Sequence, residues 1–79
     1  MADRGLILKC IHAVAEDKTA VPGEDESLFD SGLLDSFTLT DLASELELKF
    51  AIQIPDADLT PRKFDTIERI DSYISAKQD

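Results

Sequence analysis

Residues 28–50 read LFDSGLLDSFTLTDLASELELKF, and this stretch predicts a turn followed by an amphipathic helix. Gly32 precedes the helix, where the chain must bend and a residue without a Cβ atom bends most easily. The apolar residues of the helix recur at the three- and four-residue spacing of a single face. That inner face carries Leu39, Leu42, Ala43, Leu46 and Phe50, and the opposite face carries Thr40, Asp41, Ser44, Glu47 and Lys49.

Asp35 and Ser36 stand at the join between the turn and the helix. The Ser36 hydroxyl is therefore expected at a helix start, where backbone N–H groups lack intrahelical partners and the helix dipole is positive. An anion attached to this hydroxyl would be stabilised by both effects. From the residue types alone, a plain helix cap is the simpler interpretation, because Asp and Ser are common caps worth about 1 kcal/mol.

A first helix is predicted from Arg4 to about Ala15, with Asp3 as its N-cap. His12 falls near the polar face of this helix and is expected to be a solvated surface residue. The apolar face carries Ile7, Cys10, Ile11 and Val14, so the Cys10 thiol is expected to be buried and structural.

A last helix is predicted to start at Asp65 or Thr66, and Asp65 and Glu68 have the spacing of a capping box. Its inner stripe consists of Ile67, Ile70 and Ile74, with Tyr73 beside them. The residues expected to point outward are Glu68, Arg69 and Asp71.

Two connections complete the chain. Residues 17–35 form a long first loop, which apolar side chains are expected to hold on the core. Residues 56–64 predict a short third helix or turn, capped either by Asp56 or by Thr60 with Pro61 at its first position. The predicted fold is all-α, a small four-helix bundle with a long first loop and a short third helix.

Length and composition limit the function. Seventy-nine residues predict a single domain, residues 1–79, with a small core and no room for a deep catalytic cleft. The net charge of −9 disfavours nucleic acid and anionic membranes as partners, because phosphate binding needs clustered Lys and Arg. It favours a basic patch on a partner protein, although the acidity could also serve only to keep the chain in solution.

The remaining features exclude other classes. The single cysteine rules out an internal disulfide and a cysteine-based metal cluster, and the acidic first loop lacks a calcium-ligand ladder, so no metal site is predicted. No apolar run is long enough to span a membrane, and the N-terminus lacks a signal-peptide pattern. We therefore expect a monomeric cytoplasmic protein.

The run Gly32-Leu33-Leu34-Asp35-Ser36-Phe37, with Leu-Phe-Asp upstream and an amphipathic helix downstream, resembles the acyl carrier protein family. The resemblance continues through later landmarks in the same order and covers roughly residues 6–76. Those landmarks are Ile54-Pro55-Asp56, Asp65-Thr66-Ile67 and Tyr73-Ile74.

The resemblance implies that a phosphopantetheinyl transferase attaches 4′-phosphopantetheine from coenzyme A to Ser36 of the Asp35-Ser36 pair. The terminal thiol would carry an acyl or aminoacyl group as a thioester for fatty-acid, polyketide or related biosynthesis, and the chain would not be an enzyme. Acyl-activating or synthase enzymes with basic patches would dock on the second helix. The expected docking residues are Asp35, Phe37, Thr40, Asp41, Ser44, Glu47 and Leu48, with Asp56 and Asp58 extending the acidic surface.

The second helix is less acidic than is common in fatty-acid carriers, and the motif is similar to those of stand-alone carriers of specialised pathways, including D-alanyl carriers. Two alternatives come from other classes. One is an acidic helical interaction module without a prosthetic group. The other, and the weaker, is an enzyme with Ser36 and His12 in a triad, for which the chain is too small to build an oxyanion pocket.

Overall fold

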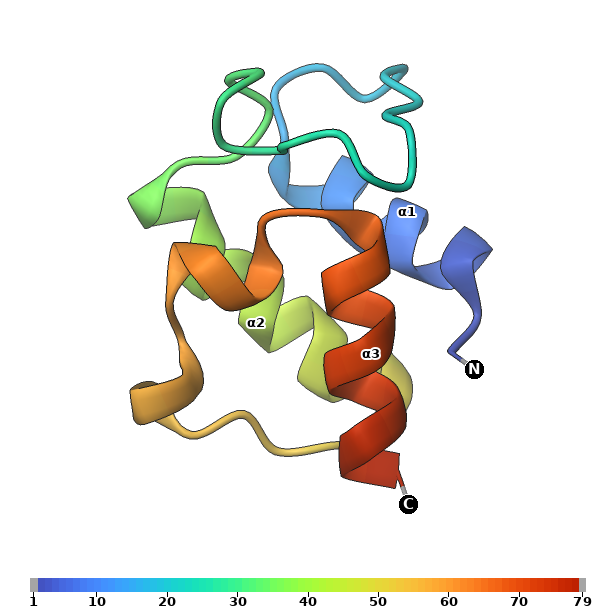
Figure 1. The fold of residues 1–79 in the computed structure, drawn as a ribbon, viewed down its shortest axis with the longest axis vertical. Helices are drawn as coiled ribbons and strands as arrows, with labels where there is room; N and C mark the ends of the chain where they lie inside the picture. Colours follow the sequence, from blue (N-terminus) through green and yellow to red (C-terminus); the bar gives the residue numbers. More distant parts are fainter. Residues whose placement is uncertain (1, 79) are drawn as a thin grey trace.

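The computed structural model describes residues 2–78, within which three α-helices and two short 3-10 helices form (Figure 1). The long first loop crosses the top of the molecule in Figure 1, over one end of the helices. Helix α1 packs on α2 and α3, and η2 fills the space between α2 and α3. The elements are α1 (Arg4–Val14), α2 (Ser36–Phe50), η1 (Asp56–Asp58), η2 (Pro61–Phe64) and α3 (Ile67–Gln78).

The core confirms the three apolar stripes predicted from helical spacing. Each of the three α-helices contributes fully or nearly fully buried side chains, and Phe64 of η2 is also fully buried. Leu28 and Leu34 anchor the first loop in the same core, as expected. Burial raises the pKa of the Cys10 thiol, in keeping with a structural role. The helical core residues are Ile7, Cys10, Ile11, Leu39, Leu42, Ala43, Leu46, Ile67, Ile70 and Ile74.

The ends of the first two helices follow from local chemistry. Asp3 caps α1 by accepting a hydrogen bond from the Leu6 N–H at 3.1 Å. Helix α2 ends at Ala51, which adopts the left-handed conformation (φ 55°, ψ 47°) that usually selects glycine. The Ile52 N–H then donates to the Glu47 carbonyl at 3.3 Å, which closes the last turn.

The predicted short third helix is replaced by two 3-10 turns, so the four-helix count is not met within residues 2–78. The Thr60 register forms as η2, whereas η1 has Pro55 as its N-cap residue, so Asp56 is the first residue of that turn and not its cap. Proline explains the split, because Pro61 restricts the preceding Thr60 to extended backbone (φ −124°, ψ 146°) and prevents one helix from crossing both segments. Thr60 is the N-cap residue of η2, but neither turn has a side-chain cap.

Two predictions for α3 were wrong. The Asp65 and Glu68 side chains form no capping box. Instead the Thr66 hydroxyl accepts from the Arg69 N–H at 3.0 Å, while the Asp65 carboxylate accepts from the Ser27 hydroxyl at 2.6 Å. Asp71 does not point outward but is 3% exposed, because Arg4 of α1 faces it across the helix contact.

His12 also differs from its prediction as a solvated residue. Its side chain is half-buried, and Nε2 lies 2.6 Å from the carbonyl oxygen of Ala20. This hydrogen bond ties the first loop to α1.

No helix within residues 2–78 is both long and apolar enough to cross a membrane.

Candidate functional site

Ser36 is the first residue of α2, and its side chain is exposed. The cap of this helix is Asp35, whose Oδ1 accepts hydrogen bonds from the backbone N–H groups of Phe37 and Thr38, both at 2.9 Å. The Thr38 hydroxyl completes a capping box by accepting from the Asp35 N–H at 2.8 Å. No hydrogen bond holds the Ser36 hydroxyl within the described part of the chain, so it is free to react.

Thr38 was missed as a cap partner by the sequence analysis. Its signal was present, because Asp35 and Thr38 have the three-residue spacing of a capping box. The usual form places Glu or Gln at this third helical position, and a Thr there is easily overlooked.

The capping box changes the expected electrostatics of the site. The hydrogen bond from the Thr38 backbone, followed by that from Phe37, lowers the pKa of Asp35 and keeps its carboxylate charged. The N–H groups of Phe37 and Thr38 are therefore already occupied by an anion. This leaves the helix dipole as the main source of stabilisation for an anion attached to Ser36, and that stabilisation stays a prediction.

The chain leading to Ser36 is fixed by the turn before it. Gly32 has φ +83°, a left-handed conformation that favours glycine, and its N–H donates to the Phe29 carbonyl at 3.1 Å. Leu34 is 2% exposed, and its N–H donates to the Leu28 carbonyl at 2.9 Å. Ser36 thus follows a buried anchor by two residues, so its position is set by the core although its hydroxyl faces solvent.

The outward face of α2 carries most of the predicted docking residues. Phe37 and Leu48 are 85% and 72% exposed, and eleven residues of helix separate them by about 16 Å. Single exposed apolar side chains are common on protein surfaces, so the docking role of Phe37 and Leu48 stays a prediction. Between and beside them, Thr40, Asp41 and Ser44 are exposed, as is Asp56 of η1.

Two of the predicted acidic docking residues also form hydrogen bonds within the fold. Glu47 is half-buried, and its Oε2 accepts from the Ile54 N–H at 2.8 Å, which holds the segment after α2. Asp58 accepts from Lys63 Nζ at 2.9 Å and from the Tyr73 hydroxyl at 2.7 Å. These bonds lower the pKa of Asp58, while desolvation and Asp58 raise the pKa of Tyr73 to about 12. Both carboxylates are therefore already hydrogen-bonded within the chain, and their role in docking stays a prediction.

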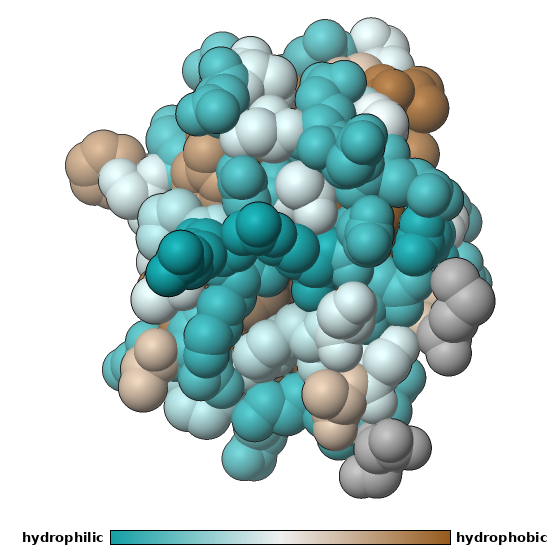
Figure 2. Space-filling view, viewed as in Figure 1, coloured by the Kyte–Doolittle hydropathy of each residue, from teal (hydrophilic) through white to brown (hydrophobic). Residues whose placement is uncertain are grey.

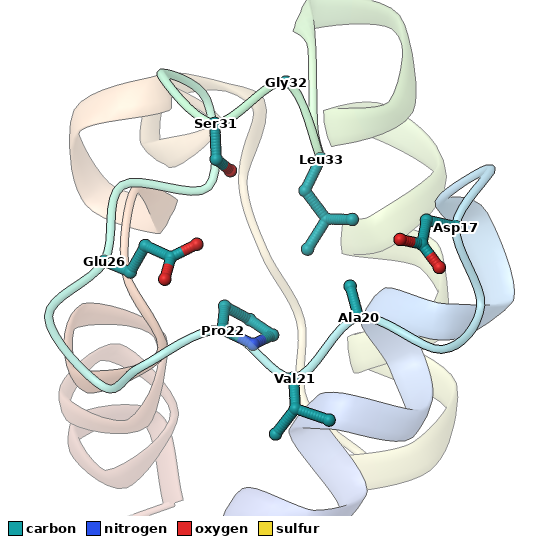
Figure 3. A pocket seen from close by; sticks show the side chains of 8 residues that line it. All are labelled: Asp17, Ala20, Val21, Pro22, Glu26, Ser31, Gly32 and Leu33. Carbon is teal, nitrogen blue, oxygen red and sulfur yellow. The ribbon is translucent and has the colours of Figure 1, made fainter.

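A hollow of about 260 Å³ lies under the first loop, close to the start of α2 (Figure 3). A second hollow, of about 200 Å³, shares Asp17, Gly32 and Leu33 with it and extends to Asp35 and Thr38. Val21, beside the first hollow, is 79% exposed and was not singled out by the sequence analysis. A loop residue without periodicity offers no signal that would have predicted this exposure.

The model of the protein family described as "Phosphopantetheine attachment site" matches residues 6–73 of the chain. The chain belongs to the acyl carrier protein family. A D-alanyl carrier protein of Listeria welshimeri is 32% identical over 76 residues, which cover 96% of this chain and 97% of the relative. An acyl carrier protein of Thermotoga maritima is 33% identical over 81 residues, with 98% of each chain covered.

Membership of this carrier family has three direct consequences. The prosthetic group of the carrier is 4′-phosphopantetheine, which is attached covalently. Acyl carrier proteins bind and present cargo but do not catalyse reactions, so this carrier is not an enzyme. They work with a phosphopantetheinyl transferase and with partner enzymes that act on the cargo.

Proposed function

We propose that this carrier binds 4′-phosphopantetheine through the Ser36 oxygen and holds an acyl or aminoacyl group as a thioester on the terminal thiol. Partner enzymes would receive the cargo while the chain keeps it tethered nearby. Tethering raises the effective concentration of the cargo at a docked enzyme without any catalytic residue on the carrier.

The observation that carries the proposal is the free, exposed hydroxyl of Ser36. Among the serine side chains described, only Ser36 and Ser72 donate no hydrogen bond within the chain, and both are exposed. Ser72 lies in the middle of α3, whereas Ser36 lies at a helix start that follows extended backbone at Asp35 (φ −141°, ψ −178°).

The surroundings of Ser36 fit the attachment chemistry. Ser36 Oγ would form a bond to phosphorus, the bond from that phosphorus to adenosine 3′,5′-bisphosphate would break, and the hydroxyl proton would pass to a base. Asp35 is a poor base because its pKa is lowered and its Oδ1 is engaged by Phe37 and Thr38. The transferase must therefore supply the base. Once attached, the group supplies a flexible arm that ends in a thiol.

The cargo we favour is aminoacyl. Several relatives of similar length are D-alanyl carrier proteins, and the second helix is less acidic than is common in fatty-acid carriers. Fatty-acid and polyketide intermediates are the alternative, which the Thermotoga relative supports. Hydroxylamine release of the bound group from the loaded carrier, followed by its mass, would distinguish these cargoes.

Partner enzymes are proposed to dock on the outward face of α2. Phe37 and Leu48 would be the apolar anchors, and Asp41 and Asp56 would attract basic side chains of the partner. Thr40 and Ser44 lie on the same exposed surface between the anchors. Glu47 contributes to this surface only indirectly, through its bond to Ile54.

The attachment is tested by incubating the apo carrier with coenzyme A and a broad-specificity phosphopantetheinyl transferase. The intact mass should rise by one phosphopantetheine on the wild type and on Ser72→Ala, and should stay unchanged on Ser36→Ala. Loading of Ser36→Ala would move the site elsewhere. If the wild type gained no mass while a control carrier was loaded, an interaction module without a prosthetic group would be the better description.

A further inference from the structure

A further hollow, of about 270 Å³, lies between η2 and α3. Lys63 of η2 lines it together with Glu68, Arg69, Ser72 and Tyr73 of α3, and its lining offers more apolar than polar surface. Long basic side chains contribute to such a lining, because their carbon stems are apolar while their ends are charged. Sites for whole small molecules usually measure about 300–1,000 Å³. This hollow is therefore better suited to a single side chain of a larger partner.

The walls of the hollow are held in place by contacts within the fold. The Tyr73 ring packs on Phe64 with the ring centroids 5.0 Å apart, and its hydroxyl donates to Asp58 Oδ2 at 2.7 Å. Arg69 Nη1 donates to the backbone carbonyl of Arg62 at 2.7 Å, which joins α3 to η2. An occupant would meet side chains that are already ordered, so binding would cost less conformational entropy.

Charge distinguishes this hollow from the others. Three other hollows of the described residues have carboxylates in their lining and no Lys or Arg side chain. Residues 62–77 hold four of the chain's eight Lys and Arg residues. Figure 2 looks onto this face, and its darkest teal, which marks the most hydrophilic residues, lies over η2 in the middle of the view. The four basic residues are Arg62, Lys63, Arg69 and Lys77.

Two of these four cations have no acidic partner. Lys63 and Lys77 pair with Asp58, at 2.9 and 3.7 Å. Arg62 and Arg69 are exposed and form no ion pair within residues 2–78. Their guanidinium groups are therefore the positive charges of this face that remain available to a partner.

The carboxylates of the same segment offset little of this charge. Asp71 is buried and accepts from Arg4, and Asp65 is half-buried and accepts from the Ser27 hydroxyl. Glu68 is exposed and is the one carboxylate in the lining of the hollow. The chain as a whole has a net charge of −9, yet this face is locally basic.

We propose that the hollow between η2 and α3 receives an apolar side chain from an acidic segment of a partner protein, whose carboxylates bind Arg62 and Arg69. Guanidinium groups bind carboxylates through two parallel hydrogen bonds, which fixes the orientation of the segment as well as its position. The binding residues belong to η2 and α3, which lie in front of α2 in Figure 1. The segment thus holds the carrier without using the outward face of α2, and the inference does not depend on attachment at Ser36.

The test is fluorescence anisotropy of a labelled peptide in which one Phe is flanked by Glu residues, titrated with the apo carrier at low salt. The wild type and Ser36→Ala should bind it equally. Arg62→Glu and Arg69→Glu should each raise Kd about fivefold or more, because each replaces an attraction by a repulsion. Lys9→Glu makes the same change of charge at an exposed position of α1 and should change Kd less than twofold. Circular dichroism melting confirms that each variant is folded.

The remaining measurements locate the binding. A peptide with Ser in place of Glu should not bind, and added NaCl should weaken binding of the acidic peptide. Backbone amide chemical shifts should change at Ser72 and Tyr73 when the peptide is added. Absence of binding to the wild type, an equal loss for Lys9→Glu, or shift changes confined to α2 and the first loop would overturn the inference. It would also be overturned if the carrier bound phosphatidylglycerol vesicles and not the peptide, because this face would then be a membrane surface.

Discussion

Replacing Asp71 with asparagine should destabilise the carrier strongly, because Asp71 is the buried charge that joins the chain's beginning to α3. Its carboxylate accepts from Ala2 N and Arg4 Nε, both at 2.7 Å, and from the Ser75 hydroxyl at 3.1 Å. Arg4 also pairs with Glu24 of the first loop. The Arg4 side chain therefore links α1 to Asp71 of α3 and to Glu24 of the first loop.

The magnitude follows from these contacts. Asparagine keeps the shape of Asp71 but places an NH₂ group against either Ala2 N or Arg4, so a donor faces a donor. Breaking a buried ion pair lowers the free energy of unfolding by about 3–5 kcal/mol. Because the Arg4 side chain is 28% exposed and keeps its ion pair with Glu24, we expect a smaller loss of roughly 2–3 kcal/mol for Asp71→Asn. A chain of this length has a free energy of unfolding of about 4–12 kcal/mol, and Tm should fall by roughly 8–24 °C.

Urea unfolding at pH 7, followed by circular dichroism, measures this difference. The matched control is Glu68→Gln, which removes the same charge from an exposed position of α3 and should change the free energy of unfolding by less than about 0.5 kcal/mol. If Asp71→Asn proved as mild as the control, the buried pair would contribute no net stability and the argument from burial would be refuted.

The effect should also depend on pH. The hydrogen bond from Arg4, followed by that from Ala2 N, lowers the pKa of Asp71 below its ordinary value. The folded state therefore favours the charged form, and this stability is fully present above the unfolded pKa of about 3.9 and is lost as the pH falls through the folded pKa. The difference in free energy of unfolding between wild type and Asp71→Asn should shrink below about pH 4.

Three further predictions concern α2 and its C-cap. Ala51→Gly should stabilise the carrier by about 0.5–1 kcal/mol, because relief of about 1–2 kcal/mol of left-handed strain exceeds the extra entropy that glycine loses on folding. The control Ala13→Gly, inside α1, should destabilise the carrier. If thermal melts showed the same sign of change for both variants, the argument from the positive φ of Ala51 would be contradicted. Glu47→Ala should lower the free energy of unfolding by about 1–2 kcal/mol, because it leaves the Ile54 N–H unpaired. Asp41→Lys should slow cargo loading and leave Tm unchanged, because Asp41 is exposed. An unchanged loading rate for Asp41→Lys would remove it from the docking surface.

Several parts of the fold could be predicted from the sequence because they depend on neighbours a few residues apart. The stripe from Leu39 to Leu46 predicted the buried face of α2, and Asp3 predicted the start of α1. The failures depend on residues far apart in the chain. Nothing near Asp71 in α3 indicated that Arg4, 67 residues earlier, would lie opposite it.

In the candidate site, too, features set by near neighbours in the sequence could be predicted and features set by distant residues could not. The Asp35-Ser36 pair, its place before an amphipathic helix and the family resemblance were all visible in the sequence. The bond from Glu47 to Ile54 and the hollow beside Leu33 were not. Each of these requires the position of one side chain relative to a second group.

The sequence by itself determined which residues form helices, which faces are apolar and which serine opens the second helix, because helical spacing and caps act over three or four residues. Only the tertiary structure decided which charges are buried and which are free, and where the surface is hollow. Those properties depend on how helices and loops pack against each other, and packing joins residues that the chain keeps far apart.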